Sequence, residues 1–208
     1  MLTMKDETLY SNGDITVKQK GDVRILCHGL VQSAGNGTDE LLLPYTRGIV
    51  VATQYAAKLE RVLMIGLGGG SIARHLRHHN PELVIDCVEV DPAILEVAQN
   101  YFGLEQDDML QVCVADGREF IELTKELYDV IILDAYDAEG IPPHMATSGF
   151  LRLARNRLTP GGVVVGNLLK GACCETMLRA YGRVFGSVRA ITGDWPTLVV
   201  IGKGARKC

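Results

Sequence analysis

Several features are scarce or missing in this sequence of 208 residues. No apolar run approaches the roughly 18 residues of a membrane-spanning helix. The first residues, MLTMKDETLY, lack the basic start and apolar stretch of a secretory signal. None of the six cysteines forms a C-x-x-C pair, which disfavours a zinc or redox motif. We therefore expect free thiols in a cytoplasmic protein.

An excess of positive charge is also missing. Lys plus Arg number 21 against 25 for Asp plus Glu, which gives a net charge of −4 at pH 7. Nucleic acids and anionic membranes normally require a basic stripe, so we expect neither as a partner. With 47% hydrophobic and 22% charged residues, the composition is typical of a folded globular protein.

The first 58 residues differ in pattern from the rest. Residues 14–28 alternate apolar and polar side chains around Gly21, which predicts a β-hairpin with a glycine turn. Residues 32–39 are rich in Ser, Gly, Asn and Thr and predict a loop. Asp39 is a plausible N-cap for a helix that continues to Lys58. We expect residues 1–58 to form a short hairpin and helix segment.

From residue 59 to residue 208, short apolar runs alternate with amphipathic segments. The amphipathic segments carry apolar residues three to four apart, which predicts helices. This alternation predicts an α/β domain with a mostly parallel sheet covered by helices on both faces. The apolar runs are nearly continuous, as expected for strands buried on both faces. They lie at 62–66, 84–90, 110–115, 128–134, 162–168, 187–191 and 197–202.

The loops that follow the first two strands predict a nucleoside site, because ligands of open α/β sheets bind beyond the carboxyl ends of strands. Residues 66–70 read G-L-G-G-G and lead into a helix, so the backbone can approach a ligand, although a tight turn alone would also use these glycines. Glu89 lies 23 residues after Gly66. A carboxylate that accepts ribose hydroxyls is expected at a spacing of about 20. A dinucleotide is less favoured, because Ser71 stands where that fingerprint has Gly or Ala.

Two further strand ends carry acidic residues. Asp116, followed by Gly117, can accept a hydrogen bond from an adenine amine or can cap the next helix. Asp134 and Asp137, with Tyr136 between them, follow the fourth strand beside the glycine loop. Such a carboxylate pair can accept a proton from an amine and hold a cationic substrate. The alternative is that Asp134 caps backbone groups and Asp137 begins a loop.

The histidines predict less. His75 and His79 are one helical turn apart on the first crossover helix and could share a face with each other. The sequence shows no carboxylate or third ligand beside them, so we expect no metal site. His144 follows the fourth strand and either reaches the site or meets water.

Four motifs, VLMIGLGGGS, VEVD, ADG and YDVIILDAYD, occur together in this order. In combination they resemble the polyamine aminopropyltransferases, the spermidine synthase family, within the class of S-adenosylmethionine-dependent methyltransferase folds. The resemblance extends from about Gln32 to the C-terminus. It implies a Rossmann-like domain of the class I methyltransferase type behind a shortened N-terminal β region. It also implies a homodimer.

The same resemblance implies a role for each matching residue. Asp134 would be the catalytic acid-base residue. The amine or polyamine substrate would be bound by Asp137, Tyr136, Gln32 and Tyr45. The co-substrate, S-adenosylmethionine or its decarboxylated form, would be bound by Gly66, Gly68, Gly70, Glu89, Val90, Asp116 and Gly117. No metal is implied.

Departures from the family pattern leave three functional hypotheses. The family's loop G-G-G-D-G-G holds the amine of the aminopropyl group with its aspartate, and Gly69 stands at that position. Arg47 could instead favour an anionic group. The first hypothesis is aminopropyl transfer from decarboxylated S-adenosylmethionine to a polyamine, with Asp134 accepting the proton. The second is methyl transfer to an unknown acceptor. The third is a non-catalytic nucleoside-binding or oligomeric partner protein.

Overall fold

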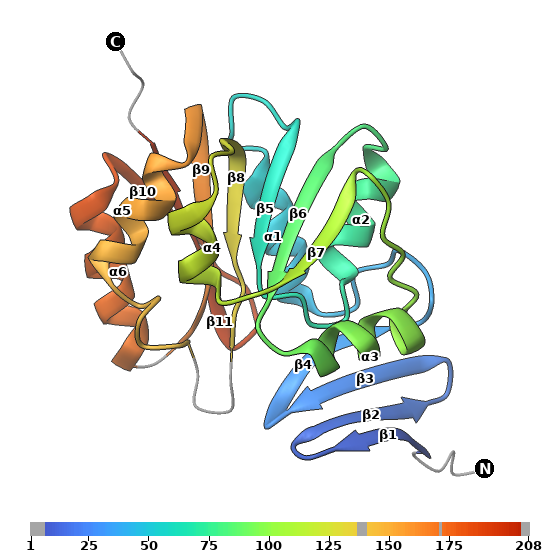
Figure 1. The fold of residues 1–208 in the computed structure, drawn as a ribbon. Helices are drawn as coiled ribbons and strands as arrows, with labels where there is room; N and C mark the ends of the chain where they lie inside the picture. Colours follow the sequence, from blue (N-terminus) through green and yellow to red (C-terminus); the bar gives the residue numbers. More distant parts are fainter. Residues whose placement is uncertain (1–6, 137–140, 171, 205–208) are drawn as a thin grey trace.

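The structure, a computed structural model, describes residues 7–136, 141–170 and 172–204. It contains a small antiparallel sheet and a larger sheet flanked by helices (Figure 1). The small sheet has four strands in chain order: β1 (Glu7–Asn12), β2 (Ile15–Lys20), β3 (Val23–His28) and β4 (Leu30–Gly35).

The predicted hairpin is confirmed as β2 and β3, with Gly21 in the turn at φ 65°. The predicted loop over 32–39 is wrong for its first residues, because β4 continues to Gly35. In β4, Ser33 lies opposite Leu26, and its neighbour Ala34 is also buried. Strand pairing uses backbone groups, so small residues that predict a loop can form a strand where a neighbouring strand is available.

The larger sheet has the order β10-β11-β9-β8-β5-β6-β7. The five strands from β5 to β9 are parallel to one another. Strand β11 is antiparallel to both of its neighbours, β9 and β10. The prediction of a mostly parallel sheet is therefore confirmed. The strand order reverses between β5 and β8, because β6 and β7 are added on one side of β5 and β8 and β9 on the other. An open sheet of this kind binds its ligand at such a point. The bounds are β5 Arg61–Ile65, β6 Val84–Glu89, β7 Leu110–Val114, β8 Tyr128–Leu133, β9 Leu158–Leu169, β10 Ser187–Ile191 and β11 Thr197–Lys203.

Helices cover both faces of the larger sheet (Figure 1). Along β5, Val62 and Met64 pack on one face while Leu63 and Ile65 pack on the other, which explains the continuous apolar runs. No helix among the described residues has both the length and the hydropathy needed to cross a membrane. The first face carries α1 (Pro44–Thr53), α2 (Ser71–His79) and α3 (Pro92–Phe102), and the second carries α4 (Gly117–Leu123), α5 (Ser148–Asn156) and α6 (Ala172–Val184).

Helix α1 begins later and ends earlier than the sequence predicts, because it stops at Thr53 and does not reach Lys58. Its N-cap is Leu43, which makes no side-chain cap, and Pro44 occupies the first turn; the prediction of Asp39 as N-cap is wrong. Proline is tolerated in a first turn but would disrupt a helix that had already started at Asp39. The helix packs on β9 and β11, so it covers the larger sheet although it follows the small one in sequence.

The small sheet is joined to the larger one through α3. The Arg24 guanidinium donates to the carbonyl oxygen of Tyr101 at 2.6 Å, and the Tyr101 hydroxyl donates to the carbonyl oxygen of Leu9 at 3.3 Å. The buried side chains Val17 and Leu26 belong to the same core cluster as the apolar face of α3. This docking holds β4 beside the glycine loop.

Candidate functional site

Two cavities meet at the carboxyl ends of the parallel strands. The smaller has a volume of about 250 Å³ and lies between the glycine loop, the ends of β6 and β7, and the segment after β8. The larger, of about 470 Å³, lies between β4, α1, α2 and β9. Both are lined by Gln32, Leu67, Gly68, Asp134 and Tyr136. A molecule that extends from one cavity into the other would therefore contact these five residues.

Gly66 lets the glycine loop pass the end of β8 at close range. Its φ is +93°, and a Cβ atom there would lie 2.3 Å from the carbonyl oxygen of Asp134. Its amide donates to the carbonyl oxygen of Val88 at 2.9 Å, which ties the loop to β6. Only glycine combines this backbone conformation with this approach.

Glu89 lies at the end of β6, where its carboxylate is tied to the glycine loop. It accepts from the amides of Leu67 at 3.0 Å and Asp91 at 3.1 Å. Burial raises the pKa of Glu89, and the backbone hydrogen bonds oppose that rise. A carboxylate oxygen can accept more than one hydrogen bond, so this carboxylate can also accept from hydroxyls of a molecule in the smaller cavity.

Asp116 has two sets of partners. One carboxylate oxygen caps α4, accepting from the amides of Arg118 at 2.8 Å and Glu119 at 3.0 Å. The other lies 3.0 Å from Nε2 of His144. Partial burial would raise the pKa of Asp116, but the two amides and His144 outweigh it and lower the pKa. The capping role is confirmed, and both Asp116 and His144 also line the smaller cavity.

Asp134 follows β8 and lines both cavities. One of its carboxylate oxygens accepts a hydrogen bond from Nδ2 of Asn167 at 2.8 Å. Burial raises the pKa of Asp134 to about 7, although the bond from Asn167 acts to lower it. A carboxyl group with this pKa can accept a proton near neutral pH and release it again.

Two tyrosines and Gln32 enclose the larger cavity. The Tyr136 hydroxyl donates to the carbonyl oxygen of Asn167 at 2.6 Å, and the Tyr45 hydroxyl donates to that of Gln32 at 3.2 Å. The Gln32 amide donates to the carbonyl oxygen of Tyr136 at 3.3 Å. Burial and the charge of Asp134 raise the pKa of both phenols. These phenols therefore stay neutral beside Asp134.

Three buried polar atoms in the lining of the larger cavity make no hydrogen bond within the described part of the chain. They are Oδ1 of Asn167, Nε1 of Trp195 and Oγ1 of Thr197. Buried polar atoms normally have a partner, and those that lack one are candidates for contact with a ligand. Asn167 and Thr197 offer oxygens that can accept from an ammonium group.

Most of the predicted site residues that the structure describes line one or both cavities, and Gly70 and Arg47 do not. Gly70 is the N-cap of α2, and its amide donates to the carbonyl oxygen of Leu67 at 3.0 Å, so it shapes the turn. Arg47 is exposed on α1, donates to the carbonyl oxygen of Leu41 at 2.9 Å, and lines neither cavity. The expected anion contact of Arg47 is therefore not supported. Asp137 lies outside the described residues.

Four site residues named here were not predicted: Asn167, Ser33, Trp195 and Thr197. Asn167 is buried near the end of β9, and Ser33 is buried in β4. The signal for Asn167 was present in the sequence, because a single amide stands inside the apolar run GVVVGNL. Ser33 accepts from the amide of Gly69 at 2.8 Å, a contact between residues 36 positions apart that no local pattern reveals.

Residues 43–198 match the family described as "Spermine/spermidine synthase domain". This match covers most of the chain, including α1 and most of the residues that line the two cavities, but not β4. The chain belongs to this family. A polyamine aminopropyltransferase of Vibrio vulnificus is 37% identical to it over 130 residues, which are 61% of this chain and 44% of the relative. The chain spans about half the length of such curated relatives.

Solved structures agree with the fold. A probable spermidine synthase from Corynebacterium glutamicum superposes with a TM-score of 0.82 at 20% identity, covering 98% of this chain and 81% of that one. Human methyltransferase-like protein 13 in complex with SAH superposes with a TM-score of 0.71 at 26% identity, covering 78% and 82% of the two chains. The class I methyltransferase fold is confirmed.

The structure leaves little space for a side chain at Gly69, where the sequence resemblance leads one to expect an aspartate. A Cβ atom at Gly69 would lie 2.9 Å from Cδ1 of Phe102 and 3.1 Å from Cβ of Ser33. The Phe102 ring thus occupies the space that a side chain would need. An aspartate at position 69 requires this ring to move.

Proposed function

We propose that this protein transfers an aminopropyl group from decarboxylated S-adenosylmethionine to an amine of the polyamine class. The main support is Asp134, a carboxyl group at the junction of the two cavities whose pKa is raised to about 7. The named relatives are polyamine aminopropyltransferases, which agrees with this assignment.

The smaller cavity suits the nucleoside part of the co-substrate. The carboxylate of Glu89, held by two backbone amides, can accept from the ribose hydroxyls. Asp116, Val90 and Gly117 also line this cavity, and the adenine would lie beside Asp116. The backbone of Gly66 and Gly68 would lie beside the ribose and the thioether.

The larger cavity suits the acceptor amine. Tyr45 and Tyr136 line it with Trp195. Oxygens of Asn167 and Thr197, which have no hydrogen-bond partner among the described residues, can accept from an amine. Asp137 is proposed as a second carboxylate for the acceptor on the family resemblance alone.

The proposed reaction needs one proton acceptor. The bound sulfonium supplies a methylene carbon that can be attacked. The lone pair of the acceptor nitrogen forms the new C–N bond while the C–S bond breaks. The electron pair of the broken C–S bond stays on the sulfur, which leaves as part of methylthioadenosine. Asp134 takes the proton from the nitrogen. Alignment of the two substrates can contribute about 7–11 kcal/mol to the lowering of the barrier.

Methyl transfer from S-adenosylmethionine is the second candidate, and Gly69 favours it. The glycine loop lacks the carboxylate that would hold the aminopropyl ammonium, and Phe102 closes that position. The human relative in the structural comparison was solved with SAH. In this alternative, the acceptor would also bind in the larger cavity.

Binding and product analysis together separate these candidates. The full chain is titrated calorimetrically with S-adenosylmethionine, its decarboxylated form and methylthioadenosine, and then incubated with each sulfonium and a set of diamines and polyamines. Tighter binding of the decarboxylated form with release of methylthioadenosine supports the proposal. Tighter binding of S-adenosylmethionine with release of SAH supports methyl transfer and contradicts it. Folded protein that binds none of the three contradicts both and leaves a non-catalytic partner role.

A Glu89→Gln variant tests the nucleoside assignment, and Glu82→Gln, an exposed acid beside β6, is the matched control. We expect Glu89→Gln to weaken methylthioadenosine binding about tenfold or more, because a carboxylate that accepts from both ribose hydroxyls is lost. Equal affinity of the two variants would contradict the assignment.

We also propose a cytoplasmic homodimer. The thiols of Cys27, Cys87, Cys113 and Cys174 are free, which fits a reducing compartment. The exposed side chains of Leu30 and Val31, each 55% accessible, lie on β4 beside the larger cavity and offer an apolar contact surface. Light scattering on the purified chain distinguishes a dimer from a monomer, and Leu30→Glu should favour the monomer if this surface is used.

A further inference from the structure

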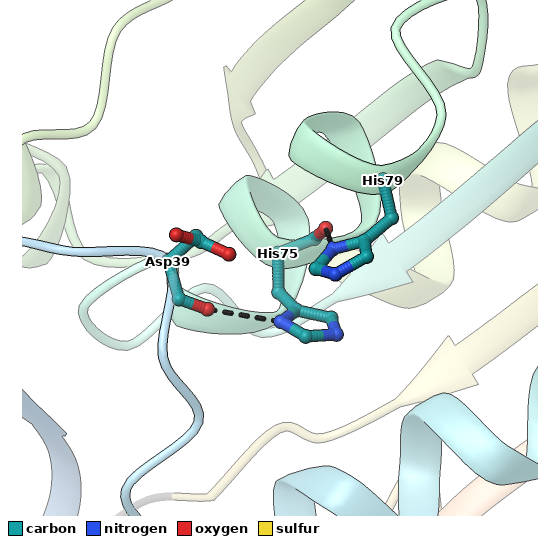
Figure 2. A group of neighbouring side chains, drawn as sticks. All are labelled: Asp39, His75 and His79. Atoms are coloured by element: carbon teal, nitrogen blue, oxygen red, sulfur yellow. Dashed lines mark hydrogen bonds between the residues drawn. The ribbon is translucent and has the colours of Figure 1, made fainter.

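A cluster outside both cavities contains three groups that bind metals. His75 and His79 lie one turn apart on α2, and Asp39 lies on the loop between β4 and α1 (Figure 2). One nitrogen of each imidazole and one carboxylate oxygen of Asp39 lie within 4.8 Å of one another. The structure thus supplies the carboxylate that the sequence alone did not show. We propose that this cluster binds a divalent transition-metal ion, zinc in particular.

The hydrogen bonds of the two imidazoles prepare them for this role. Nδ1 of His75 lies 2.9 Å from the carbonyl oxygen of Asp39, and Nδ1 of His79 lies 2.9 Å from that of His75 (Figure 2). A carbonyl oxygen only accepts, so each Nδ1 carries the proton and donates. Each Nε2 therefore keeps its lone pair, which is the form of histidine that binds metals.

The loop that carries Asp39 is held against α2 without the metal. The Arg74 guanidinium donates to the carbonyl oxygens of Thr38 at 2.7 Å and Gly37 at 3.3 Å. Oδ2 of Asp39 also lies 3.7 Å from Nε2 of His78. The carboxylate is thus already positioned at the helix, and its side chain is 34% accessible, which leaves it room to rotate.

The ligand set favours zinc over calcium or magnesium. Two imidazoles and one carboxylate form a nitrogen-rich set, whereas calcium and magnesium prefer oxygen ligands alone. Tetrahedral zinc with bonds of about 2.0–2.1 Å places its ligand atoms about 3.4 Å apart. The three groups lie within 4.8 Å of one another, so metal binding would require their side chains to turn and move closer together. Water would complete the coordination.

A metal here would join two elements that border the proposed active site. The loop of Asp39 connects β4, which carries Gln32, to α1, which carries Tyr45, and both of these residues line the larger cavity. Helix α2 follows directly from the glycine loop. The bound ion would therefore stabilise this side of the cavity, although binding itself does not depend on the proposed activity.

The experiment is a calorimetric titration of the untagged full chain with zinc, repeated with cobalt to record its visible absorption. The variants are Asp39→Asn, His75→Gln and His79→Gln, each checked for folding by circular dichroism. His28→Gln on β3 and Cys113→Ser on β7 are the controls, because they remove a histidine and an exposed thiol elsewhere. Since the His79 side chain is exposed, its replacement is not expected to affect folding.

We expect one ion per chain, a tetrahedral cobalt spectrum and a higher midpoint of thermal unfolding with zinc. Each of the three ligand variants should weaken zinc binding about tenfold or more and remove the shift of the midpoint, while the two controls should match the original chain. Zinc binding that survives in His79→Gln and Asp39→Asn would overturn the proposal. So would a loss of binding in Cys113→Ser, which would assign the ion to thiols.

Discussion

At the scale of single residues, Asp134 carries most of the proposed chemistry. Its carboxylate must be ionised to accept a proton, and burial raises its pKa to about 7. Turnover should therefore increase as pH rises through about 7, because the ionised fraction of Asp134 increases. A pH profile of kcat, recorded with saturating substrates, checks this expectation. A profile that is flat between pH 6 and pH 8 would contradict it.

Replacing the carboxylate separates chemistry from binding. We expect Asp134→Asn to lower kcat by about 10²- to 10⁴-fold, since the amide cannot take the proton. Methylthioadenosine affinity should change little, because Asn167 can still donate to the new carbonyl oxygen. Calorimetry and rate measurements on the same preparation test both parts, with the exposed Asp108→Asn as the matched control. Equal loss of affinity and rate would mean that Asp134 acts in binding instead.

The raised pKa of Asp134 also predicts an effect on stability. The pKa rises from 3.8 to about 7 on folding, so the folded state holds the proton more tightly than the unfolded state does. The free energy of unfolding therefore decreases as pH rises from about 4 to about 7. Above that range, the folded state bears the full cost of keeping the Asp134 carboxylate buried and ionised. Asp134→Asn removes this cost, and we expect it to stabilise the fold by roughly 2 kcal/mol at pH 8, after allowance for water in the cavities.

Urea denaturation at pH 4.5 and pH 8 measures this difference. Asp134→Asn should gain more stability, relative to the original chain, at pH 8 than at pH 4.5. Asp108→Asn should show no such dependence on pH. An equal effect of Asp134→Asn at both pH values would show that burial does not raise the pKa of this carboxyl group.

At the scale of elements, the glycine loop and α3 are fitted to each other. A Cβ atom at Gly69 would lie 2.9 Å from Cδ1 of Phe102, which is 3% exposed, so neither partner has free space. We expect Gly69→Asp to lower the free energy of unfolding by about 1–3 kcal/mol, as overpacking does. At Gly186 a Cβ atom would meet nothing within 4 Å, so Gly186→Asp is the control.

A double-mutant cycle isolates the contact between the loop and α3. The cost of Gly69→Asp should be smaller in a Phe102→Leu background, because the shorter side chain leaves room for the aspartate. Urea denaturation of the four proteins gives the coupling energy. Costs that add without coupling would mean that the ring of Phe102 does not exclude a side chain at position 69.

The elements themselves were largely predictable, and their exceptions have physical causes. The parallel strands could be predicted because burial on both faces demands continuous apolar runs, as in β8 and β9. Strand β4 could not, because its pairing with β3 depends on backbone groups and not on its small polar side chains. The start of α1 was misplaced because Asp39 has the character of a cap, whereas Pro44 determines where the helix can begin.

At the scale of the whole molecule, the site depends on contacts that no local pattern contains. The strand ends with Glu89, Asp116 and Asp134 could be predicted to converge, because parallel strands end at one edge of the sheet. The contact from Ser33 to the glycine loop and the approach of Asp39 to His75 join residues that the docking of the small sheet brings together. Local sequence could not predict that docking.

The small and the large sheet should therefore unfold as one unit. Leu26 of β3 is fully buried in the core cluster that also contains Phe102 of α3 and Met64 of β5. We expect Leu26→Ala to cost about 2–5 kcal/mol, the usual range for a buried leucine. Because the core is continuous, the loss should be visible at Trp195, the single tryptophan, which lies between β10 and β11 of the larger sheet.

Urea unfolding followed by Trp195 fluorescence and by circular dichroism tests this cooperativity. Both signals should move to the same lower midpoint in Leu26→Ala. Leu127→Ala, which alters a side chain that is 47% exposed, should stay within about 0.5 kcal/mol of the original chain. A fluorescence midpoint that does not move with Leu26→Ala would mean that the small sheet unfolds independently, and the support that β4 gives to the glycine loop would then be lost before the larger sheet unfolds.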